Sequence, residues 1–420
     1  RGCHGKNSGE KRRRQSPLKN EWFPHQNSQV PRSRQSLRAA FECWKNQSFN
    51  YPKSIIPNKP TFDAKIFTDN LLDNSGQWLL DALKFYIDYE RKTAPMGILV
   101  DGKWLDDEKD RYHGKGGQFK RPDSPIRHWV TPDGAAGPSG DGGFKAEPGR
   151  YHLYVAVNCP WAHRTIIFRK LKKLENVISI SFARPTRGPE GWIFENGSEA
   201  NKEHLFGKTH LHEVYTASHP DYTGRVMVPM LWDKKQNCMV NNESSEIIRM
   251  LNTAFNEFTN DTTDYYPEEL RSEIDAINNV VYKNINNGVY KTGYARSQEA
   301  YEENVIPLFE TLDSLEERLE SQRYLVGDSL TEADWRLFPT LIRFDAAYVG
   351  AFKCNVRQIK EYTNLSGYTR ELYQVPGIAS TVNIQAYKAG YYHKNKDRNP
   401  FGIVPVGPDI GFDVPHGRGA

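Results

Sequence analysis

The sequence predicts an α/β domain followed by an all-α domain, behind a long N-terminal extension. Single hydrophobic cores usually stop growing at roughly 250–300 residues, and this chain has 420. Residues 151–258 alternate between short apolar strand patterns and helical patterns, whereas residues 267–395 contain helical patterns and almost no strand signal. Two domains in that order therefore account best for the chain.

Residues 1–94 are predicted to be an extension that is partly disordered. The segment begins polar and interrupted by prolines, and residues 1–40 hold ten Lys or Arg against two Glu. The basic run at 11–14 has no periodic pattern, so we expect a solvated tail rather than a nucleic-acid partner. Such a leader leaves a plastid or mitochondrial location open, although we expect a cytoplasmic one. Apolar residues at helical spacing predict a helix over 69–92.

Composition excludes several classes of protein. The sequence has no apolar run of the roughly 18 residues that a membrane helix needs, so we expect no membrane partner. The cysteines lack the spacing of a metal site or of a disulfide framework, which indicates a reducing compartment and no bound metal. There are five, Cys3, Cys43, Cys159, Cys238 and Cys354.

Residues 95–150 are predicted to be a loop-rich lead-in, and the α/β domain follows at 151. The lead-in has many glycines but no Gly-x-x-x-x-Gly-Lys-Ser/Thr, so it is not a phosphate loop. A strand at 151–157, a helix at 159–174 and a strand at 177–183 make a β-α-β unit with parallel strands. Strands at 225–233 and 238–240 and a helix at 243–255 then follow. This order is that of a thioredoxin-like domain.

The second domain, 267–395, is predicted to be all-α, and residues 396–420 form a C-terminal tail. Its segments carry apolar residues at helical spacing with almost no strand pattern. Thr331 with Asp334 three positions later is a capping-box arrangement before an apolar run. We read this pair as a helix start only.

Cys159 is the first candidate for chemistry, although a lone cysteine is more often a small buried hydrophobe. It lies at a strand-to-helix junction in the sequence CPWA, with Pro160 suited to the first helical position. Unpaired N–H groups and the positive end of the helix dipole favour a thiolate there, and His163 and Arg164 could add positive charge. We therefore expect Cys159 to be a nucleophile.

The position where thioredoxin-type proteins carry a second cysteine is Ala162 here. A mixed disulfide on Cys159 then needs an external thiol for its release. Glutathione is the obvious thiol of a reducing compartment. A thioredoxin-like domain followed by helices is also the architecture of a glutathione transferase.

Further residues suit a ligand with two carboxylates and an amine. Val228 precedes Pro229, and a cis bond there would expose the Val228 backbone to the ligand, although a trans proline at a sheet edge reads the same. Glu243 and Ser244 open a helix, where they could bind the ammonium and carboxylate of the γ-glutamyl group or simply cap the helix. Arg225 and Trp192 are weaker candidates, for a carboxylate and for stacking.

With these residues assembled, the sequence resembles the glutathionyl-hydroquinone reductases, the Xi class of glutathione transferases, over roughly residues 95–410. The resemblance rests on several long motifs in the same order. It departs at Tyr294, where we expect Phe, at Met227, and in the loop 134–143. The motifs are RYHLYVAVNCPWAHRT, GWIFE, RVMVPMLWDKK, VNNESSEIIRMLN, NNGVYKTGYA, RYLVGDSLTEADWRLFPTLIRFDAAYVGAFKCN and NPFGIVPVGP.

The resemblance implies a catalytic Cys159, with glutathione, the co-substrate, bound by Trp192, Arg225, Val228, Glu243 and Ser244. It also implies tyrosine hydroxyls over the second-substrate pocket, from Tyr290 and from Tyr391 or Tyr392. The implied reaction removes glutathione from a glutathionyl-hydroquinone, as in quinone detoxification, and the implied assembly is a homodimer.

Two alternatives remain open at this point. An Omega-like thioltransferase or dehydroascorbate reductase would share the cysteine and the glutathione site but lack the tyrosine pocket. A non-catalytic scaffold with the same architecture would need neither, and the intact Cys159 with its full set of glutathione candidates argues against it.

Overall fold

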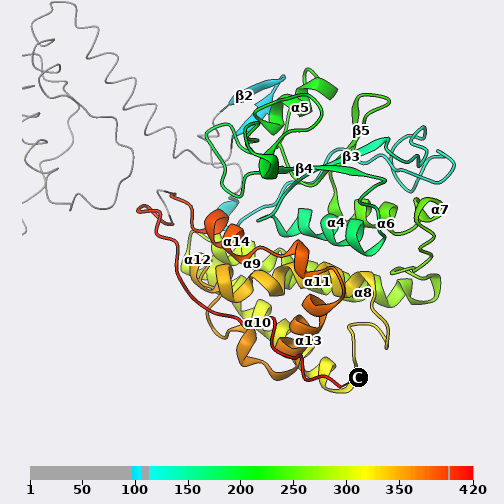
Figure 1. The fold of residues 1–420 in the computed structure, drawn as a ribbon. Helices are drawn as coiled ribbons and strands as arrows, with labels where there is room; N and C mark the ends of the chain where they lie inside the picture. The colour runs from blue at the N-terminus through cyan, green and yellow to red at the C-terminus, as the bar shows by residue number, and fades with distance from the viewer. Residues whose placement is uncertain (1–96, 106–112, 396–397, 420) are drawn as a thin grey trace, which may run out of the picture. The chain divides into compact units, whose positions relative to one another are not determined.

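The computed structural model describes residues 97–105, 113–395 and 398–419 (Figure 1). The chain divides into a unit of residues 1–76 and a unit of residues 77–420, and every described residue belongs to the second. The predictions for 1–94, including the helix at 69–92, lie outside the described residues.

A four-stranded mixed sheet forms the α/β part, in the order β4-β3-β5-β6. These strands are Ser179–Ala183, Tyr151–Ala156, Met230–Asp233 and Cys238–Asn241. Leu153 of β3 lies opposite Ile180 in the parallel pair with β4 and opposite Leu231 in the antiparallel pair with β5. Every residue of β3 is buried, because helices cover the sheet. A short hairpin of β1 (Ile98–Val100) and β2 (Lys103–Leu105) precedes the sheet.

Two helices lie between this sheet and the all-α part, α4 (Pro160–Leu171) and α6 (Ser244–Thr253), while α5 (Leu211–Ser218) lies on the other side of the sheet (Figure 1). Helix α4 connects the parallel strands β3 and β4, as predicted. The helix ends at Leu171 rather than at the predicted residue 174. The chain turns just after this end, at Lys173, which has φ +54°.

The prediction of a strand over 225–233 is wrong in its first half, because β5 begins only at Met230. Pro229 has no N–H to offer a neighbouring strand. The carbonyls of the preceding residues accept from side chains instead. The hydroxyl of Tyr215 donates to the Met227 oxygen at 2.8 Å, and that of Tyr222 donates to the Arg225 oxygen at 3.1 Å.

The second part is helical. Its longer described helices are α8 (Arg271–Val281), α9 (Gly288–Gly293), α10 (Gln298–Ser321), α11 (Glu332–Arg343), α13 (Thr363–Gln374) and α14 (Ile384–Tyr391), with the short α7 (Asn256–Thr259) and α12 (Val349–Ala351). Helix α11 starts as predicted, with the Thr331 N–H and hydroxyl donating to the Asp334 carboxylate at 2.8 and 3.1 Å. Wide π-helical turns follow α8 and α11, at Tyr282–Asn286 and Phe344–Tyr348.

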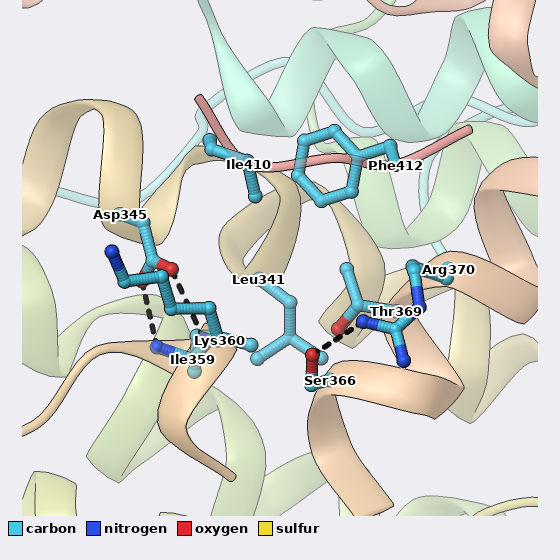
Figure 2. Close-up of a pocket in the computed structure, with 9 residues that line it drawn as sticks. All are labelled: Leu341, Asp345, Ile359, Lys360, Ser366, Thr369, Arg370, Ile410 and Phe412. Atoms are coloured by element: carbon cyan, nitrogen blue, oxygen red, sulfur yellow. Dashed lines mark hydrogen bonds between the residues drawn. The ribbon is translucent and has the colours of Figure 1, made fainter. Parts of the chain in front are cut away.

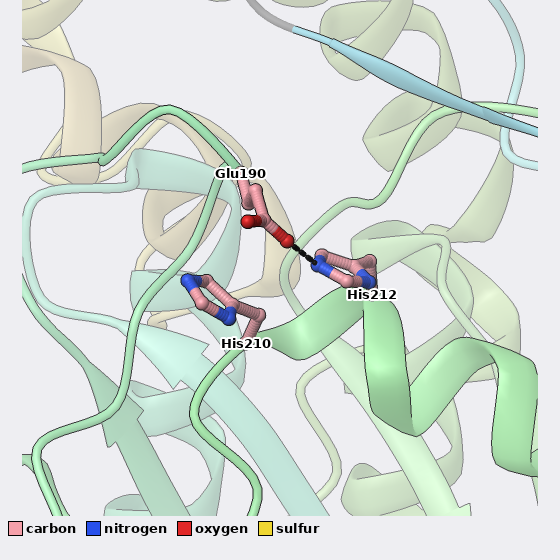
Figure 3. Close-up of side chains that lie close together, drawn as sticks. All are labelled: Glu190, His210 and His212. Atoms are coloured by element: carbon pink, nitrogen blue, oxygen red, sulfur yellow. Dashed lines mark hydrogen bonds and ion pairs between the residues drawn. The ribbon is translucent and has the colours of Figure 1, made fainter. Parts of the chain in front are cut away.

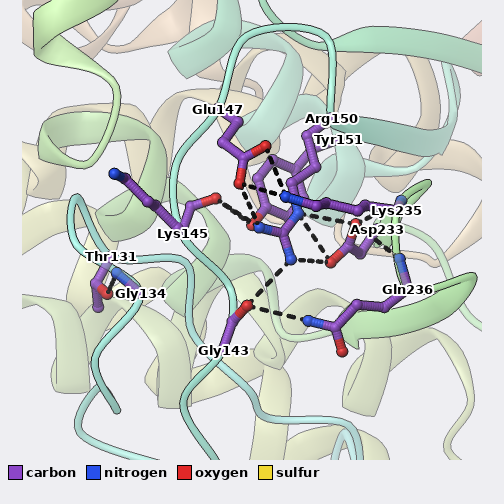
Figure 4. Close-up of polar contacts among 10 residues, drawn as sticks. All are labelled: Thr131, Gly134, Gly143, Lys145, Glu147, Arg150, Tyr151, Asp233, Lys235 and Gln236. Atoms are coloured by element: carbon purple, nitrogen blue, oxygen red, sulfur yellow. Dashed lines mark hydrogen bonds and ion pairs between the residues drawn. The ribbon is translucent and has the colours of Figure 1, made fainter.

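A buried ion pair fixes the start of β3 to the end of β5. Arg150 contacts the Asp233 carboxylate through Nε at 3.0 Å and through its terminal nitrogen at 2.5 Å. The same guanidinium reaches Glu147, the Gly143 carbonyl and the Lys145 carbonyl (Figure 4). This network anchors the end of the lead-in to the sheet.

Within the described residues, no helix combines the length and the apolar character needed to cross a membrane.

The C-terminal tail packs on the helical part. The Gln374 amide donates to the carbonyls of Phe412 and Val414 at 2.9 and 2.7 Å. Beneath the tail lies a small pocket that contains none of the predicted site residues (Figure 2). It is lined by Leu341, Asp345, Ile359, Lys360, Ser366, Thr369, Arg370, Ile410 and Phe412.

Candidate functional site

Cys159 lies at the N-terminus of α4, where it is the N-cap residue and Pro160 is the first helical residue. Its carbonyl accepts from the His163 N–H at 3.0 Å, which closes the first turn. Its half-buried Sγ lies 3.5 Å from the Val228 carbonyl oxygen. The strand-to-helix junction therefore directs the thiol toward the segment that precedes β5.

The two residues before Cys159 are held by Arg343, a fully buried residue at the end of α11. Its guanidinium donates to the Val157 oxygen at 2.8 Å and to the Asn158 oxygen at 3.1 Å. It also donates to Nδ1 of His163 at 3.0 Å. One side chain of the helical part thus fixes the backbone on which Cys159 sits.

His163 does not supply the positive charge suggested by the sequence. Burial, and then the Arg343 charge, hold its pKa well below the ordinary value, so it is neutral. Its Nδ1 accepts from Arg343, and its Nε2 donates to the Thr381 hydroxyl at 2.8 Å. The expectation failed because the residue one turn after Cys159 faces the interface with the helices.

Three of the residues expected to bind glutathione lie around the N-termini of α4 and α6. The peptide bond between Val228 and Pro229 is cis, as predicted. Ser244 begins α6 and is buried, 3.4 Å from a guanidinium nitrogen of Arg164 on α4. Glu243 is the N-cap of α6. Helices α4 and α6 pack together, so both helix N-termini face the same region.

Glu243 is held ionised at this helix start. Its carboxylate accepts from the N–H and hydroxyl of Ser245 at 3.0 and 2.9 Å and from the Ser124 hydroxyl at 3.0 Å. Burial acts to raise the pKa of Glu243, but these hydrogen bonds and the Arg164 charge outweigh it, and the pKa lies below its usual value. The carboxylate can therefore receive an ammonium group.

The other two candidates, Trp192 and Arg225, lie in the segment between β4 and β5. Trp192 is buried beneath Arg187, whose guanidinium carbon is 4.1 Å from the ring centre. Among the described residues, its indole N–H has no hydrogen-bond partner. The Arg225 charge lowers the pKa of Tyr294, so Arg225 is within electrostatic range of that ring.

A cluster of three tyrosine hydroxyls gathers in the helical part. The Tyr290 hydroxyl lies 2.7 Å from that of Tyr391, and Tyr391 lies 3.1 Å from that of Tyr348. Tyr392 does not join them, because its hydroxyl donates to the Ala347 carbonyl at 3.3 Å. Of the two adjacent candidates, Tyr391 is therefore the member of the cluster. Tyr348 was not predicted as a site residue, because nothing in the sequence pattern distinguishes it from the other tyrosines.

The cluster stays protonated, and its member Tyr290 lies within electrostatic range of Cys159. Burial, and then the Cys159 charge, raise the pKa of Tyr290 to about 12, and burial raises the pKa values of Tyr348 and Tyr391 well above the ordinary value. The Trp161 ring, two residues after Cys159, lies 6.3 Å from the Tyr290 ring. These phenols can therefore donate hydrogen bonds at neutral pH.

The lead-in supplies further residues that the sequence analysis missed. Arg121 lies over the rings of Trp161 and Tyr290, with its guanidinium carbon 4.8 and 4.7 Å from their centres. Ser124 contacts Glu243, as described above. The lead-in thus covers both ends of the site. An irregular segment has no periodicity, so only the folded structure reveals these contacts.

Comparison with known proteins bears on the fold and the family. Models described as the glutathione S-transferase N-terminal and C-terminal domains match residues 158–254 and 298–371. The glutathionyl-hydroquinone reductase YqjG of Escherichia coli K12 is 50% identical over 324 residues, which cover 77% of this chain and 98% of that protein. The glutathionyl-hydroquinone reductase PcpF of Sphingobium chlorophenolicum is 51% identical over 313 residues, 74% of this chain and 96% of that protein.

A solved Xi-class transferase from Natrialba magadii superposes with a TM-score of 0.70 at 44% identity, covering 77% of this chain and 96% of that one. The chain belongs to the Xi class of glutathione transferases. The predicted fold class and family resemblance are thereby confirmed, whereas the boundaries proposed at 151–258 and 267–395 and the residue roles stay predictions.

One group of side chains in this Xi-class transferase could hold a metal ion, although the sequence analysis expected none. Glu190, His210 and His212 offer ligand atoms within 4.8 Å of one another, and His212 Nε2 lies 2.8 Å from the Glu190 carboxylate (Figure 3). They lie where the turn before Trp192 meets the start of α5. None of them belongs to the cysteine and tyrosine cluster, so the chemistry below does not involve them.

Proposed function

We propose that this transferase reduces glutathionyl-hydroquinones to hydroquinones, with glutathione as the reductant and oxidised glutathione as the second product. The observation that carries the proposal is the cluster of protonated hydroxyls of Tyr290, Tyr348 and Tyr391 beside Cys159. The names of the relatives YqjG and PcpF support it, as does the solved structure of YqjG with glutathione bound.

In the first step, the Cys159 thiolate attacks the sulfur of the glutathionyl group. A Cys159–glutathione disulfide forms, the bond between that sulfur and the ring carbon breaks, and the carbon keeps the electron pair and takes a proton. In the second step, the thiolate of another glutathione attacks this disulfide. Oxidised glutathione leaves and the Cys159 thiolate returns, so each cycle oxidises two sulfur atoms, the thioether sulfur of the substrate and the thiol sulfur of the second glutathione, and reduces one ring carbon.

The first step is difficult because an aryl carbon is a poor leaving group, and the tyrosine cluster can make its departure easier. If the ring first shifts to its keto tautomer, the carbon departs as an enolate whose charge resides on oxygen. Tyr290 and Tyr391 are donors aimed at that oxygen, and Tyr348 supports Tyr391 by a hydrogen bond. Tyr392, which bonds a backbone carbonyl, has no such role.

Glutathione itself is proposed to lie along the N-termini of α4 and α6. The Val228 backbone pairs with the cysteinyl segment of glutathione and brings its sulfur toward Cys159, whose Sγ lies 3.5 Å from the Val228 oxygen. Glu243 receives the ammonium, and Ser244 with the α6 N–H groups receives the γ-glutamyl carboxylate. Arg225 and Trp192 hold the remaining carboxylate end.

The direct test compares two substrates in one preparation. The protein should release hydroquinone from a glutathionyl-hydroquinone at a much higher kcat/KM than it reduces a small glutathione mixed disulfide or dehydroascorbate. The reverse order would favour an Omega-like thioltransferase, and activity on neither would favour a scaffold. We also propose a homodimer acting in the cytoplasm without a bound metal, which light scattering, localisation of the tagged full chain and metal analysis can check.

A further inference from the structure

The aromatic residues around Tyr290, proposed to face the second substrate, lie beside positive charge that the reaction above does not use. Arg121 lies against Tyr290, as described. Arg398, from the C-terminal tail, lies against Tyr294 and Phe352, with its guanidinium carbon 4.5 and 5.4 Å from their ring centres. The rings of Tyr294 and Phe352 both pack against the Tyr290 ring, with 6.3 and 5.4 Å between the ring centres. Two guanidinium groups from distant segments therefore reach the same aromatic stack.

Neither arginine has a carboxylate partner among the residues that the structure describes. Arg121 donates from Nε to the neutral amide oxygen of Asn287 at 2.8 Å, and the Arg398 guanidinium makes no hydrogen bond within the described chain. Elsewhere the protein pairs such side chains, as Arg249 with Glu332 at 2.9 Å. Both side chains are half-buried, so water reaches their unpaired guanidinium N–H groups only in part. These N–H groups can donate charge-assisted hydrogen bonds to an anionic ligand.

Tyr294 lies in the same positive electrostatic field and offers a hydroxyl group as a further hydrogen-bond donor. It stands where the Xi-class resemblance leads us to expect Phe, and among the described residues its hydroxyl has no hydrogen-bond partner. Burial acts to raise the pKa of Tyr294, yet nearby arginines lower it more, and the pKa falls below the ordinary value. The arginines responsible, in decreasing order, are Arg398, Arg187, Arg225 and Arg121.

The four arginines divide between the two ligands. Arg187 lies on Trp192, and Arg225 belongs with it in the part proposed for glutathione. Arg121 and Arg398 lie instead on the rings that surround Tyr290. The remaining carboxylate of glutathione therefore accounts for the first pair, and the second pair is left for a group on the aromatic substrate.

We propose that this group of residues selects glutathionyl-hydroquinones whose aromatic ring carries an ionised acidic group, held by Arg121 and Arg398 with the Tyr294 hydroxyl. The inference rests on the proposed function for the reaction itself and adds the substrate class. A guanidinium fork matches a carboxylate in geometry and charge, and an ionised phenol offers the same charge on one oxygen. The recognised chemistry is an anion attached to the ring.

The experiment compares kcat/KM for a glutathionyl-hydroquinone that bears a ring carboxylate with kcat/KM for the same compound without it. The unmodified protein should favour the carboxylate about ten-fold, the effect of one charge-assisted hydrogen bond. Arg398→Gln and Arg121→Gln should each move this ratio toward one, Arg398→Lys should retain part of it, and Tyr294→Phe should lower it less. Arg184→Gln, in an exposed pair with Glu195, is the matched control and should leave the ratio unchanged.

The remaining outcomes separate the two levels of the account. Turnover of the uncharged substrate without preference for the carboxylate overturns this inference and leaves the proposed function standing, whereas no turnover of either overturns the function. An equal change for both substrates, with a raised KM for glutathione, would assign the arginines to glutathione instead. A third substrate with an acidic halogenated phenol, assayed above and below the pH at which it ionises, distinguishes a preference for phenolate from one for carboxylate.

Discussion

The hydroxyl groups of Tyr290 and Tyr391 lie 2.7 Å apart, although 101 positions separate the two residues in the sequence. Tyr290 comes from α9, which follows a π-helical turn, and Tyr391 is the last residue of α14. Tyr290 lies within electrostatic range of Cys159, which belongs to the α/β part. The proposed chemistry depends on this convergence, because a thiolate alone would make a general thioltransferase.

Loss of one of these hydroxyls should harm one reaction and spare another. Tyr290→Phe should lower kcat for glutathionyl-hydroquinone reduction by about ten- to thousand-fold, the usual cost of removing a donor that stabilises developing charge. Thiol exchange with a small disulfide should change little, since a sulfur leaving group needs no such donor. Tyr392→Phe, at the neighbouring residue outside the cluster, is the matched control, and steady-state assays of both reactions measure the contrast. Equal losses on both substrates would contradict the role given to Tyr290.

Arg343 should act as a positioning residue for Cys159. Arg343→Gln removes donors to the Val157 and Asn158 carbonyls, and a displaced nucleophile should slow the single-turnover transfer of glutathione to Cys159 by about ten- to hundred-fold. Arg343→Lys keeps one donor and should recover part of that rate. Arg357→Gln, in an exposed pair with Asp313, serves as the control.

This effect can be separated from a general loss of stability. Rates are measured well below the unfolding temperature, together with the affinity for glutathione, which should change less than the transfer rate. A transfer rate in Arg343→Gln equal to that of the unmodified protein would show that the backbone before Cys159 needs no such support.

His152 predicts how stability depends on pH. Its ring nitrogens lie 2.7 and 2.9 Å from the hydroxyls of Ser179 and Ser181, and burial is the main cause that lowers its pKa to about 3. The unfolded chain therefore binds a proton that the folded one does not, so this contribution is present above about pH 6.5 and is lost as pH falls toward 3. The slope in that window is about 1.4 kcal/mol per pH unit.

Urea unfolding between pH 4 and pH 7 tests this contribution. His152→Gln cannot titrate, so the free energy of unfolding should fall less steeply with acid than it does in the unmodified protein. His416→Gln, at a half-buried histidine of the C-terminal tail that is not among the groups shifting the pKa of His152, is the control and should keep the original slope. Identical slopes for His152→Gln and the unmodified protein would mean that His152 takes up a proton in the folded state.

The sequence was most informative where local rules decide the structure. Pro160 after Cys159, and Thr331 with Asp334, each mark a helix start by interactions within a few residues, and both starts were predicted correctly. It was least informative where distant segments meet. Neither the contact of Arg343 with the residues before Cys159 nor that of Arg121 with Tyr290 leaves a periodic pattern, because each depends on how the domains and the lead-in pack.

The most direct test of the central claim is a single turnover without free glutathione. Incubated with an excess of glutathionyl-hydroquinone, the protein should release one hydroquinone per active site and retain one glutathionyl group, which peptide mass mapping should find on Cys159. Cys159→Ser should release none while still binding glutathione. Release by Cys159→Ser at the rate of the unmodified protein, or a glutathionyl group mapped to Cys238 instead, would contradict the account.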